Sequence, residues 1–406
     1  MLCNKSKSIV FLVLLIFGTN LNSLKAQSFY SSQGIGLLSY FVSGRSTGMG
    51  GVGLALTDAL TVSFLNPASL SALPLSTISG NFRHSVADLK NSSQEASITD
   101  TNVSGVQFVI PLKQNRVAVS LGLNPYSSIE VSFTDEILSD GNPRLETVSY
   151  DGGLSTGFLS LSIRPFNRLY LGATGLFYFG LLRNIQRVDF TSPDFLDTQA
   201  ELSQSVTGLN VRLGVIFKIL SNWSLAGVLT PGVTLNADNS LNLSVAEFPN
   251  VSTSDIELPL AFGVGTSFGL GRKLLVGIDY YKQQWSEASN EGFNNDSQFN
   301  NDSQRFALGL EYSGRGSFRD SYFSRMAVRA GIYYKILGLE EPVGEKVTEI
   351  FATIGLGLPI KWSAGRLDLA LETGRRGSSS QNPFRENVIR FTGSITIGEK
   401  WFLRRR

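Results

Sequence analysis

Residues 45–70 read RSTGMGGVGLALTDALTVSFLNPASL and differ in character from the sequence on either side of them. Glycine is concentrated within six residues: Gly48, Gly50, Gly51 and Gly53. Glycine permits positive φ and close backbone approach, and the Asn-Pro pair in Asn66-Pro67-Ala68 favours a turn. We therefore expect a compact, irregular segment with one short helical piece at about 57–65. Its backbone groups need partners, which a larger structure around it would supply.

The glycine run does not predict a phosphate-binding loop, because no Lys-Ser or Lys-Thr pair follows it and no buried strand precedes it. His84 is the only histidine, and Cys3 is the only cysteine. Metal sites and catalytic triads need several such side chains, so we expect no metal, no cofactor and no enzymatic activity.

The first 26 residues have the pattern of a secretory signal peptide. Lys5 and Lys7 precede the apolar core at 9–18, and Ala26 suits cleavage. Removing Lys5, Lys7 and Lys25 from the 35 basic residues leaves 32, against 33 acidic residues. The exported chain is therefore nearly neutral, and no nucleic-acid partner is expected.

From residue 77 onward, apolar and polar residues alternate over segments of about ten residues, the pattern of transmembrane β-strands. In residues 366–372, for example, Leu369 is expected to face lipid and Asp368 the lumen. About fourteen such segments predict an all-β fold, a transmembrane antiparallel β-barrel, with a soluble β-sandwich as the competing class. The predicted division is a signal peptide at 1–26, a hatch at 27–74 and a barrel at 75–406.

The connections between these segments are alternately short and long, as in outer-membrane barrels with short periplasmic turns and long outer loops. We expect the long, polar ones at 88–102, 134–147, 187–205 and 236–255, among others. This parity places both termini in the periplasm and the protein in the outer membrane of a Gram-negative bacterium, surrounded by its lipid.

Aromatic residues mark the expected membrane interfaces. Trp223, Trp362 and Trp401 fall beside predicted periplasmic turns or ends, and Trp285 falls at an outer strand end. The last segment, 388–402, alternates and ends in an aromatic residue, which resembles the signal read by the β-barrel assembly machinery. That machinery is therefore an expected partner during biogenesis.

The segment in front of the strands resembles the hatch of the FadL/OMPP1 outer-membrane transport family, and of related PorV-type barrels. The residues that carry the resemblance are Arg45, Gly48, Gly50, Gly51, Gly53, Asp58, Ala59, Asn66, Pro67 and Ala68. The resemblance implies that this segment folds inside the barrel. Ser69 departs from the family, which usually has glycine after Asn-Pro-Ala.

Members of that family pass long-chain fatty acids or other hydrophobic molecules, and the substrate leaves through an opening at a kink in the third strand. The third segment here is interrupted at Asn124-Pro125. Proline removes a ladder donor and is confined to bulges and edges. Asn124 and Pro125 are therefore the predicted lateral gate, with an ordinary bulge as the alternative.

Charges of both signs are expected to face the lumen: Arg83, Arg164, Arg212, Lys218, Arg329, Lys335, Arg390, Asp279, Glu311, Glu349, Asp368 and Glu372. They indicate a hydrated lumen whose ion pairs hold the hatch, or alternatively a selectivity ladder. The leading hypothesis is passage of hydrophobic, fatty-acid-like small molecules by a hatch and a lateral opening. The alternatives are a PorV-like barrel that handles secreted proteins without transport, and a structural outer-membrane protein.

Overall fold

A computed structural model gives the protein's structure over thirteen stretches of the chain. The described residues are 28–32, 34–40, 43–58, 62–90, 95–139, 142–192, 194–244, 246–288, 301–314, 321–340, 346–360, 364–377 and 385–401. The expected signal peptide lies outside them. Within them, no helix has the length and apolar character needed to cross a membrane.

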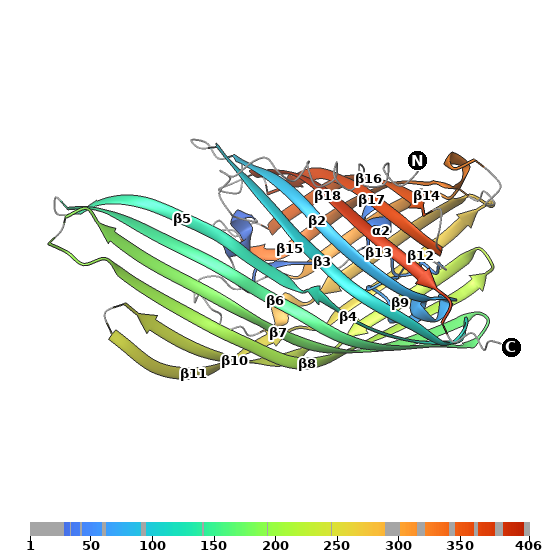
Figure 1. The fold of residues 1–406 in the computed structure, drawn as a ribbon, viewed down its shortest axis with the longest axis horizontal. Coiled ribbons are helices and arrows are strands. Elements are labelled where there is room, and N and C mark those ends of the chain that lie inside the picture. Colours follow the sequence, from blue (N-terminus) through green and yellow to red (C-terminus); the bar gives the residue numbers. More distant parts are fainter. Residues whose placement is uncertain are drawn as a thin grey trace, which may run out of the picture.

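Antiparallel strands form a closed barrel of fourteen strand positions (Figure 1). Eleven positions are single strands: β2 (Ser76–Lys90), β3 (Glu95–Lys113), β6 (Asn142–Phe166), β7 (Leu169–Phe190), β8 (Thr198–Leu220), β13 (Leu274–Gln283), β14 (Ser303–Tyr312), β15 (Ala327–Glu340), β16 (Lys346–Pro359), β17 (Ala364–Arg376) and β18 (Arg385–Glu399). Three positions are split: β4 (Val117–Pro125) with β5 (Ser127–Ser139), β9 (Trp223–Thr230) with β10 (Val233–Leu243), and β11 (Ala246–Leu258) with β12 (Ala261–Leu270). Pairing of β18 with β2 closes the barrel.

Alternation along the strands separates the lipid face from the lumen, as the sequence predicted. On β14, Phe306 and Leu308 are exposed on the outer face, whereas Arg305 and Glu311 are buried inside. Asp368 on β17 is also buried in the lumen. A barrel with apolar residues outside and polar residues inside fits a lipid environment.

Six strands continue past the others on the side away from the short turns and form a sheet that we call the wing (Figure 1). The wing consists of residues 129–139, 142–152, 182–190, 198–207, 233–243 and 246–258 of β5, β6, β7, β8, β10 and β11. On its convex face, side chains such as Ser132, Thr134 and Ser205 are exposed and polar. The wing therefore stands in water beyond the apolar band.

Several outer segments expected to be loops are strands, so those predictions were wrong. Thr134 pairs with Thr147 across the β5–β6 hairpin, and Arg187 pairs with Gln199 across β7–β8. Outside the membrane the outer face of a sheet does not need to be apolar, so the pattern that signals a transmembrane strand disappears while backbone pairing continues.

The helical pieces near the N-terminus also differ from the prediction. The described residues of 57–65 contain no helix; instead, η1 (Phe29–Ser32), α2 (Gly44–Gly48) and η2 (Pro67–Ala72) are short helices. Local capping explains two of them. Ser43 accepts a hydrogen bond from the Ser46 N–H at the start of α2, and Asn66 accepts one from the Ala68 N–H at the start of η2.

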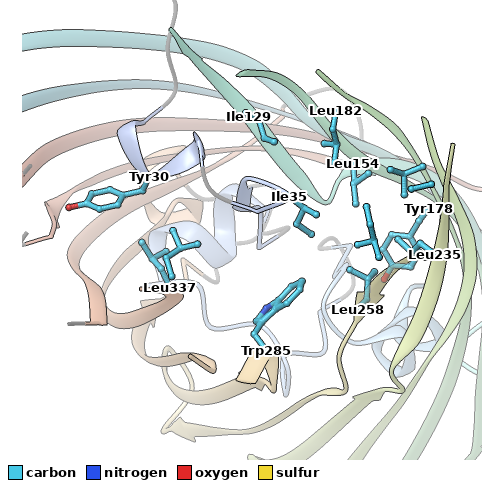
Figure 2. Packing of buried hydrophobic residues seen from close by; sticks show 14 of the residues in the cluster. Tyr30, Ile35, Ile129, Leu154, Tyr178, Leu182, Leu235, Leu258, Trp285 and Leu337 are labelled. Atoms are coloured by element: carbon cyan, nitrogen blue, oxygen red, sulfur yellow. The ribbon is translucent and has the colours of Figure 1, made fainter. Parts of the chain in front are cut away.

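Trp285 is not an interface residue, contrary to the sequence expectation. It follows β13 in the short helix η3 (Trp285–Glu287) and is fully buried. Figure 2 shows it pointing inward, toward Leu258 of β11 and the hatch residue Ile35, in an apolar ring inside the outer mouth of the barrel. Trp223 and Trp401 lie at the turn end, and Trp362 lies outside the described residues.

Candidate functional site: the hatch and its seat in the barrel

The described residues of the segment 28–72 lie inside the barrel. Its helix α2 contacts β15, β16, β17 and β18, while η2 contacts β4, β6, β7 and β8 on the other side of the lumen. Met49, Val52 and Leu54 between these helices are buried to 2% exposure or less. The hatch thus crosses the lumen from one wall to the other.

Glycines on the wall make room for the hatch backbone. A Cβ at Gly331 of β15 would overlap the backbone of Met49 and Gly50, and one at Gly309 of β14 would overlap Met49. A Cβ at Gly48 of the hatch would lie 2.9 Å from the Cα of Gly355 on β16. The glycines of the predicted motif therefore meet glycines of the barrel, and backbone packs directly on backbone.

Six charged residues close into a ring of alternating sign, which we call the latch ring: Arg45, Glu311, Arg329, Asp368, Arg366 and Asp58. The hatch contributes Arg45 and Asp58. Arg45 donates Nε and Nη2 to the two Glu311 oxygens at 2.7 and 2.8 Å, and Nη1 to Asp58 at 3.1 Å. This two-pronged contact fixes the Arg45 side chain in both position and orientation.

The wall contributes the rest of the latch ring. Arg329, whose side chain is 0% exposed, donates to Glu311 and to Asp368, each at 2.7 Å. Arg366 donates to Asp368 at 2.9 Å and to Asp58 at 3.1 Å. Because Asp58 belongs to the hatch, this last contact closes the ring. Each member has an opposite charge on both sides, so the buried charges are compensated in place.

Further hydrogen bonds hold the glycine-rich turn. Asp279 on β13 accepts from the N–H groups of Gly53 and Leu54 at 2.6 and 2.9 Å. The Thr353 hydroxyl on β16 accepts from the Gly50 N–H at 2.9 Å and donates to the Gly48 carbonyl at 3.1 Å. The irregular backbone obtains from the barrel the partners that it cannot supply itself.

The Asn66-Pro67-Ala68 turn is seated on the opposite wall. Asn66 donates its amide to the carbonyls of Leu54 and Val215, at 2.9 and 3.2 Å. A Cβ at Gly214 would overlap Asn66, and one at Gly172 would overlap the backbone of Pro67 and Ala68. The motif residues thus join two parts of the hatch to β7 and β8.

The first described residues are anchored near the outer mouth. Glu386 of β18 accepts from the Ser28 hydroxyl at 2.7 Å and from the Phe29 N–H at 2.9 Å. Arg376 of β17 donates to Glu386 at 2.6 Å and to Ser28 at 2.7 Å. The ring of Phe29 then packs edge-on against Phe133 of β5, with centroids 5.6 Å apart.

The predicted gate residues lie where the barrel wall divides. Asn124 and Pro125 end β4 and remain paired with Thr156 and Ser155 of β6. On the other edge, pairing of β4 with β3 stops at Leu123. The outer part of β3 pairs only with β2 among the described residues, so β3 and β5 diverge; we call this opening the seam.

The seam begins at the outer border of the apolar band. Leu121 and Leu123, just before it, are more than half exposed on the lipid face, whereas Ser132, Thr134 and Glu136 follow on that face of β5. Strand edges without a ladder partner are tolerated at membrane depth only where protein or water covers them. On the lumen side Phe29 packs in one apolar cluster with Val131 and Ile98.

Two small cavities and one larger cavity lie beside the hatch. A cavity of about 80 Å³ lies near Tyr40, Arg305 and Lys335, and one of about 70 Å³ lies near Asn124 and Tyr126. Both are far below the roughly 300–1,000 Å³ of typical ligand sites. A larger cavity, of about 660 Å³, lies on the side of the short turns. Within the described ranges, no group of three or more His, Cys, Asp and Glu side chains could hold a metal ion.

A family model described as BamG matches residues 5–406, nearly the whole chain. The chain belongs to the BamG family. No curated protein matches it. The predicted relation to PorV-type barrels stays a prediction.

Solved structures share the fold of this BamG-family member. A Pseudomonas aeruginosa FadL homologue is 13% identical, with a TM-score of 0.62, over 89% of this chain and 99% of that one. The Ralstonia pickettii toluene transporter TbuX is 15% identical, with a TM-score of 0.59, over 88% and 98%. The Pseudomonas putida toluene transporter TodX is 15% identical, with a TM-score of 0.54, over 94% and 100%. The fold is therefore that of FadL-type outer-membrane barrels, as the hatch motif suggested.

Sequence reasoning found the hatch residues but missed their partners. Glu311, Arg329 and Asp368 were expected to face the lumen, yet nothing in their spacing pairs them with Arg45, at least 266 positions earlier. Arg366 was not singled out at all, although its place two residues before Asp368 puts both side chains on one face of β17.

Proposed function

We propose that this protein works as a closed outer-membrane barrel that takes part in handling other outer-membrane proteins, together with the β-barrel assembly machinery. The family name BamG points to that machinery. The observation that carries the proposal is the combination of a plugged lumen with a large outer sheet. The two cavities near Tyr40 and Asn124 have volumes of only about 80 and 70 Å³, and the latch ring residues Arg45, Asp58, Glu311 and Arg366 line the larger cavity on the side of the short turns.

Two features of the structure, the tightly packed hatch and the wing, fit a protein-handling barrel better than a channel. A channel needs a hatch that yields, whereas here backbone packs on backbone at Gly331 and Gly309. A protein-handling barrel needs a surface outside the membrane, and the wing supplies a polar one (Figure 1).

The test is depletion and co-purification in cells that carry this chain. An affinity-tagged full chain should co-purify with the central barrel of the assembly machinery in mild detergent. Depleting the chain should lower several unrelated outer-membrane barrels at least threefold, while inner-membrane proteins stay constant. Normal barrel levels after depletion, with no co-purification, would overturn the proposal.

A second candidate is passage of hydrophobic molecules, favoured by the ring of apolar residues at the outer mouth and by the seam. The apolar ring joins the hatch to β5, β6, β7, β8, β10 and β11 (Figure 2). Aromatic side chains also line the small cavity beside Asn124: Tyr40, Phe64, Tyr126, Phe158, Tyr178 and Tyr281. A fatty-acid-like molecule would enter over these surfaces, displace Phe29 and leave beside Asn124 and Pro125.

Uptake of a labelled fatty acid and of toluene by cells producing the chain tests this candidate. Pro125→Val restores a ladder donor and should slow uptake without unfolding the barrel, whereas Pro259→Val, away from the seam, should not. Uptake no higher than with an empty vector would eliminate passage, and the protein-handling function would stand alone.

A further inference from the structure

A small cavity between the hatch and the barrel wall is lined by charged side chains of both signs. It has a volume of about 80 Å³, which is enough for a few water molecules or for one small anion with its water. The hatch contributes Tyr40, Thr47 and Gly51 to its lining. The charged residues of its wall are Arg83, Arg305, Lys335, Arg376, Arg390, Asp100, Glu349 and Glu372. Basic side chains therefore outnumber acidic ones around this space, five to three.

One carboxylate, Glu349 of β16, is shared among three of these cations. Arg376 holds it most closely, donating to Glu349 at 2.5 Å and to Glu386 at 2.6 Å. Lys335 and Arg390 approach Glu349 only to 3.9 Å each. Arg376 is thus compensated on two sides, whereas Lys335 and Arg390 have no close carboxylate.

Arg83 of β2 and Arg305 of β14 have still less compensation. Neither forms an ion pair with the described part of the chain. Arg305 donates to the Gly50 carbonyl at 3.0 Å, and its guanidinium lies 5.3 Å from the centre of the Tyr333 ring. The Nε atom of Arg83 is buried and has no hydrogen-bond partner among the same residues.

The remaining carboxylates nearby already accept hydrogen bonds from uncharged groups. Glu372 accepts from the Tyr333 hydroxyl at 3.2 Å, and Asp100 accepts from the Asn102 amide at 2.8 Å. Asp279, which lies beyond the cavity lining, accepts from the N–H groups of the glycine-rich turn. The cavity is therefore rich in donors and poor in acceptors.

The hatch adds a further donor without a partner. Thr47 on α2 lines the cavity and is 1% exposed, and its hydroxyl forms no hydrogen bond within the described ranges. The buried Thr392 hydroxyl is also unpartnered there, and Thr392 lies directly opposite Arg83 in the pairing of β18 with β2. Buried polar groups without protein partners are uncommon in native proteins and indicate a bound water molecule or ion.

An anion would satisfy these groups better than water alone. Arginine and lysine side chains can donate hydrogen bonds but cannot accept them, so the cavity needs an acceptor. A water molecule would accept some of these bonds but would leave the positive charge uncompensated. Buried charge without compensation is strongly unfavourable, and an anion removes that penalty.

We propose that this cavity binds a small inorganic anion such as chloride, between Thr47 of the hatch and the wall residues Arg83, Lys335 and Arg390. The anion accepts from the Thr47 hydroxyl and from the charged N–H groups of the wall, and such charge-assisted bonds are strong. It therefore ties α2 to the wall at a place that the latch ring does not reach. The cavity is far smaller than typical sites for organic ligands, so the hydrocarbon chain of a fatty acid does not fit in it.

Urea titration of the purified full-length chain in two salts tests the proposal. Sodium chloride is compared with sodium gluconate at the same ionic strength, because gluconate is too large for the cavity while general screening of charge is equal. Chloride at about ten times its dissociation constant should shift the unfolding equilibrium about tenfold toward the folded barrel. Limited proteolysis of the hatch should slow in the same salt.

Variants connect this effect to the cavity. Arg83→Gln removes one cation, and it should abolish the difference between the two salts. Arg212→Gln is the matched control, because Arg212 is also a partly buried, lumen-facing arginine but lies on β8, outside this cavity. Thr47→Val keeps the shape of the side chain and should weaken chloride binding about fivefold, which keeps the test decisive if Arg83→Gln does not fold.

Bromide locates the anion directly, because it replaces chloride and scatters X-rays anomalously. Crystals of the full-length chain grown in sodium bromide should show an anomalous peak between Thr47 and Arg83. Equal stability in chloride and gluconate would overturn the proposal, as would an equal loss of the chloride effect in Arg212→Gln. Bromide crystals in which only water occupies the cavity would also overturn it. So would displacement of bromide by decanoate, since the cations would then hold the carboxylate of a hydrophobic acid.

Discussion

The hatch level of the barrel and the wing are built from some of the same strands, but their two faces are arranged differently. At the hatch level, β6 has exposed Leu159 and Leu161 on the lipid face and buried Ser162 bonded to the hatch. Thirteen residues earlier, the same strand carries Ser149, whose hydroxyl shares a hydrogen bond with Ser132 on the exposed convex face of the wing. One strand therefore passes from a region where its outer face is apolar to a region where its outer face is polar.

The difference shows where sequence changes should matter. At the hatch level, removing one buried charge leaves its partner uncompensated, and adding a side chain at a glycine produces an overlap with the hatch backbone. A charge placed on the outer face there enters lipid. On the convex face of the wing, water can satisfy what a substitution disturbs, whereas Leu182, Leu235 and Ile256 on the concave face are buried. The following experiments test this contrast in order of decreasing expected effect.

The largest effect is expected from Glu311→Ala in the latch ring. It leaves Arg45 and Arg329 buried next to each other without their shared carboxylate, and loss of one partner of a buried pair costs about 3–5 kcal/mol. Heat-modifiability gels and urea titration should show a much lower unfolding midpoint. Glu201→Ala in the wing is the control and should change stability by less than about 0.5 kcal/mol. Similar midpoints for the two variants would contradict the contrast.

The next effect compares two leucines of similar exposure. Leu371 on β17 is 41% exposed within the apolar band, and Leu145 on β6 is 44% exposed on the wing. Leu371→Arg should cost roughly 2–4 kcal/mol because it places a charge in lipid. Leu145→Arg should leave the yield of folded barrel unchanged. If both variants lost yield equally, the wing would lie in the membrane and not in water.

A smaller effect is expected from Gly331→Ala, in which the added methyl group overlaps the hatch backbone at Met49 and Gly50. Overpacking of this kind costs about 1–3 kcal/mol. Gly80→Ala on β2 is the matched control, because a Cβ there meets nothing within 4 Å. Limited proteolysis should cut the hatch of Gly331→Ala faster than that of Gly80→Ala, and equal rates would argue against direct backbone packing.

The smallest effect should come from Asp58→Asn, at the exposed rim of the latch ring. The Asp58 side chain is 26% exposed, against 4% for Glu311, so solvent can compensate much of the lost charge. We expect a loss of about 1 kcal/mol or less in urea titration. A loss of stability as large as that of Glu311→Ala would mean that the six charges of the latch ring contribute cooperatively.

The barrel and the presence of a hatch could be predicted from the sequence because both depend on local patterns. Alternating apolar residues on β14 indicate that one face of the strand meets lipid. The glycines from Gly48 to Gly53 indicate that the hatch backbone packs closely against other backbone. The latch ring could not be predicted, because it depends on which lumen-facing charges the closed barrel brings to Arg45. Asp368 illustrates the limit: its inward direction was predicted, but not its two arginine partners.

The wing was missed for a different physical reason. Residues such as Thr134, Thr147 and Gln199 pair as strands on the polar outer face of the wing, so the outward apolar residues that mark a transmembrane strand are absent there. Trp285 differs from its prediction for the opposite reason. Its place at a strand end suggested an interface residue, whereas the interior of the mouth is apolar enough to bury it.

The latch ring also bears on the order of events during folding. Its two hatch members, Arg45 and Asp58, are neighbours in the ring and carry opposite charges. Without the hatch, the wall retains Glu311, Arg329, Asp368 and Arg366 as a continuous series of alternating charges with no net excess. The empty wall and the free segment are each electrically balanced, so the strands can close into a cylinder first and receive the hatch afterwards.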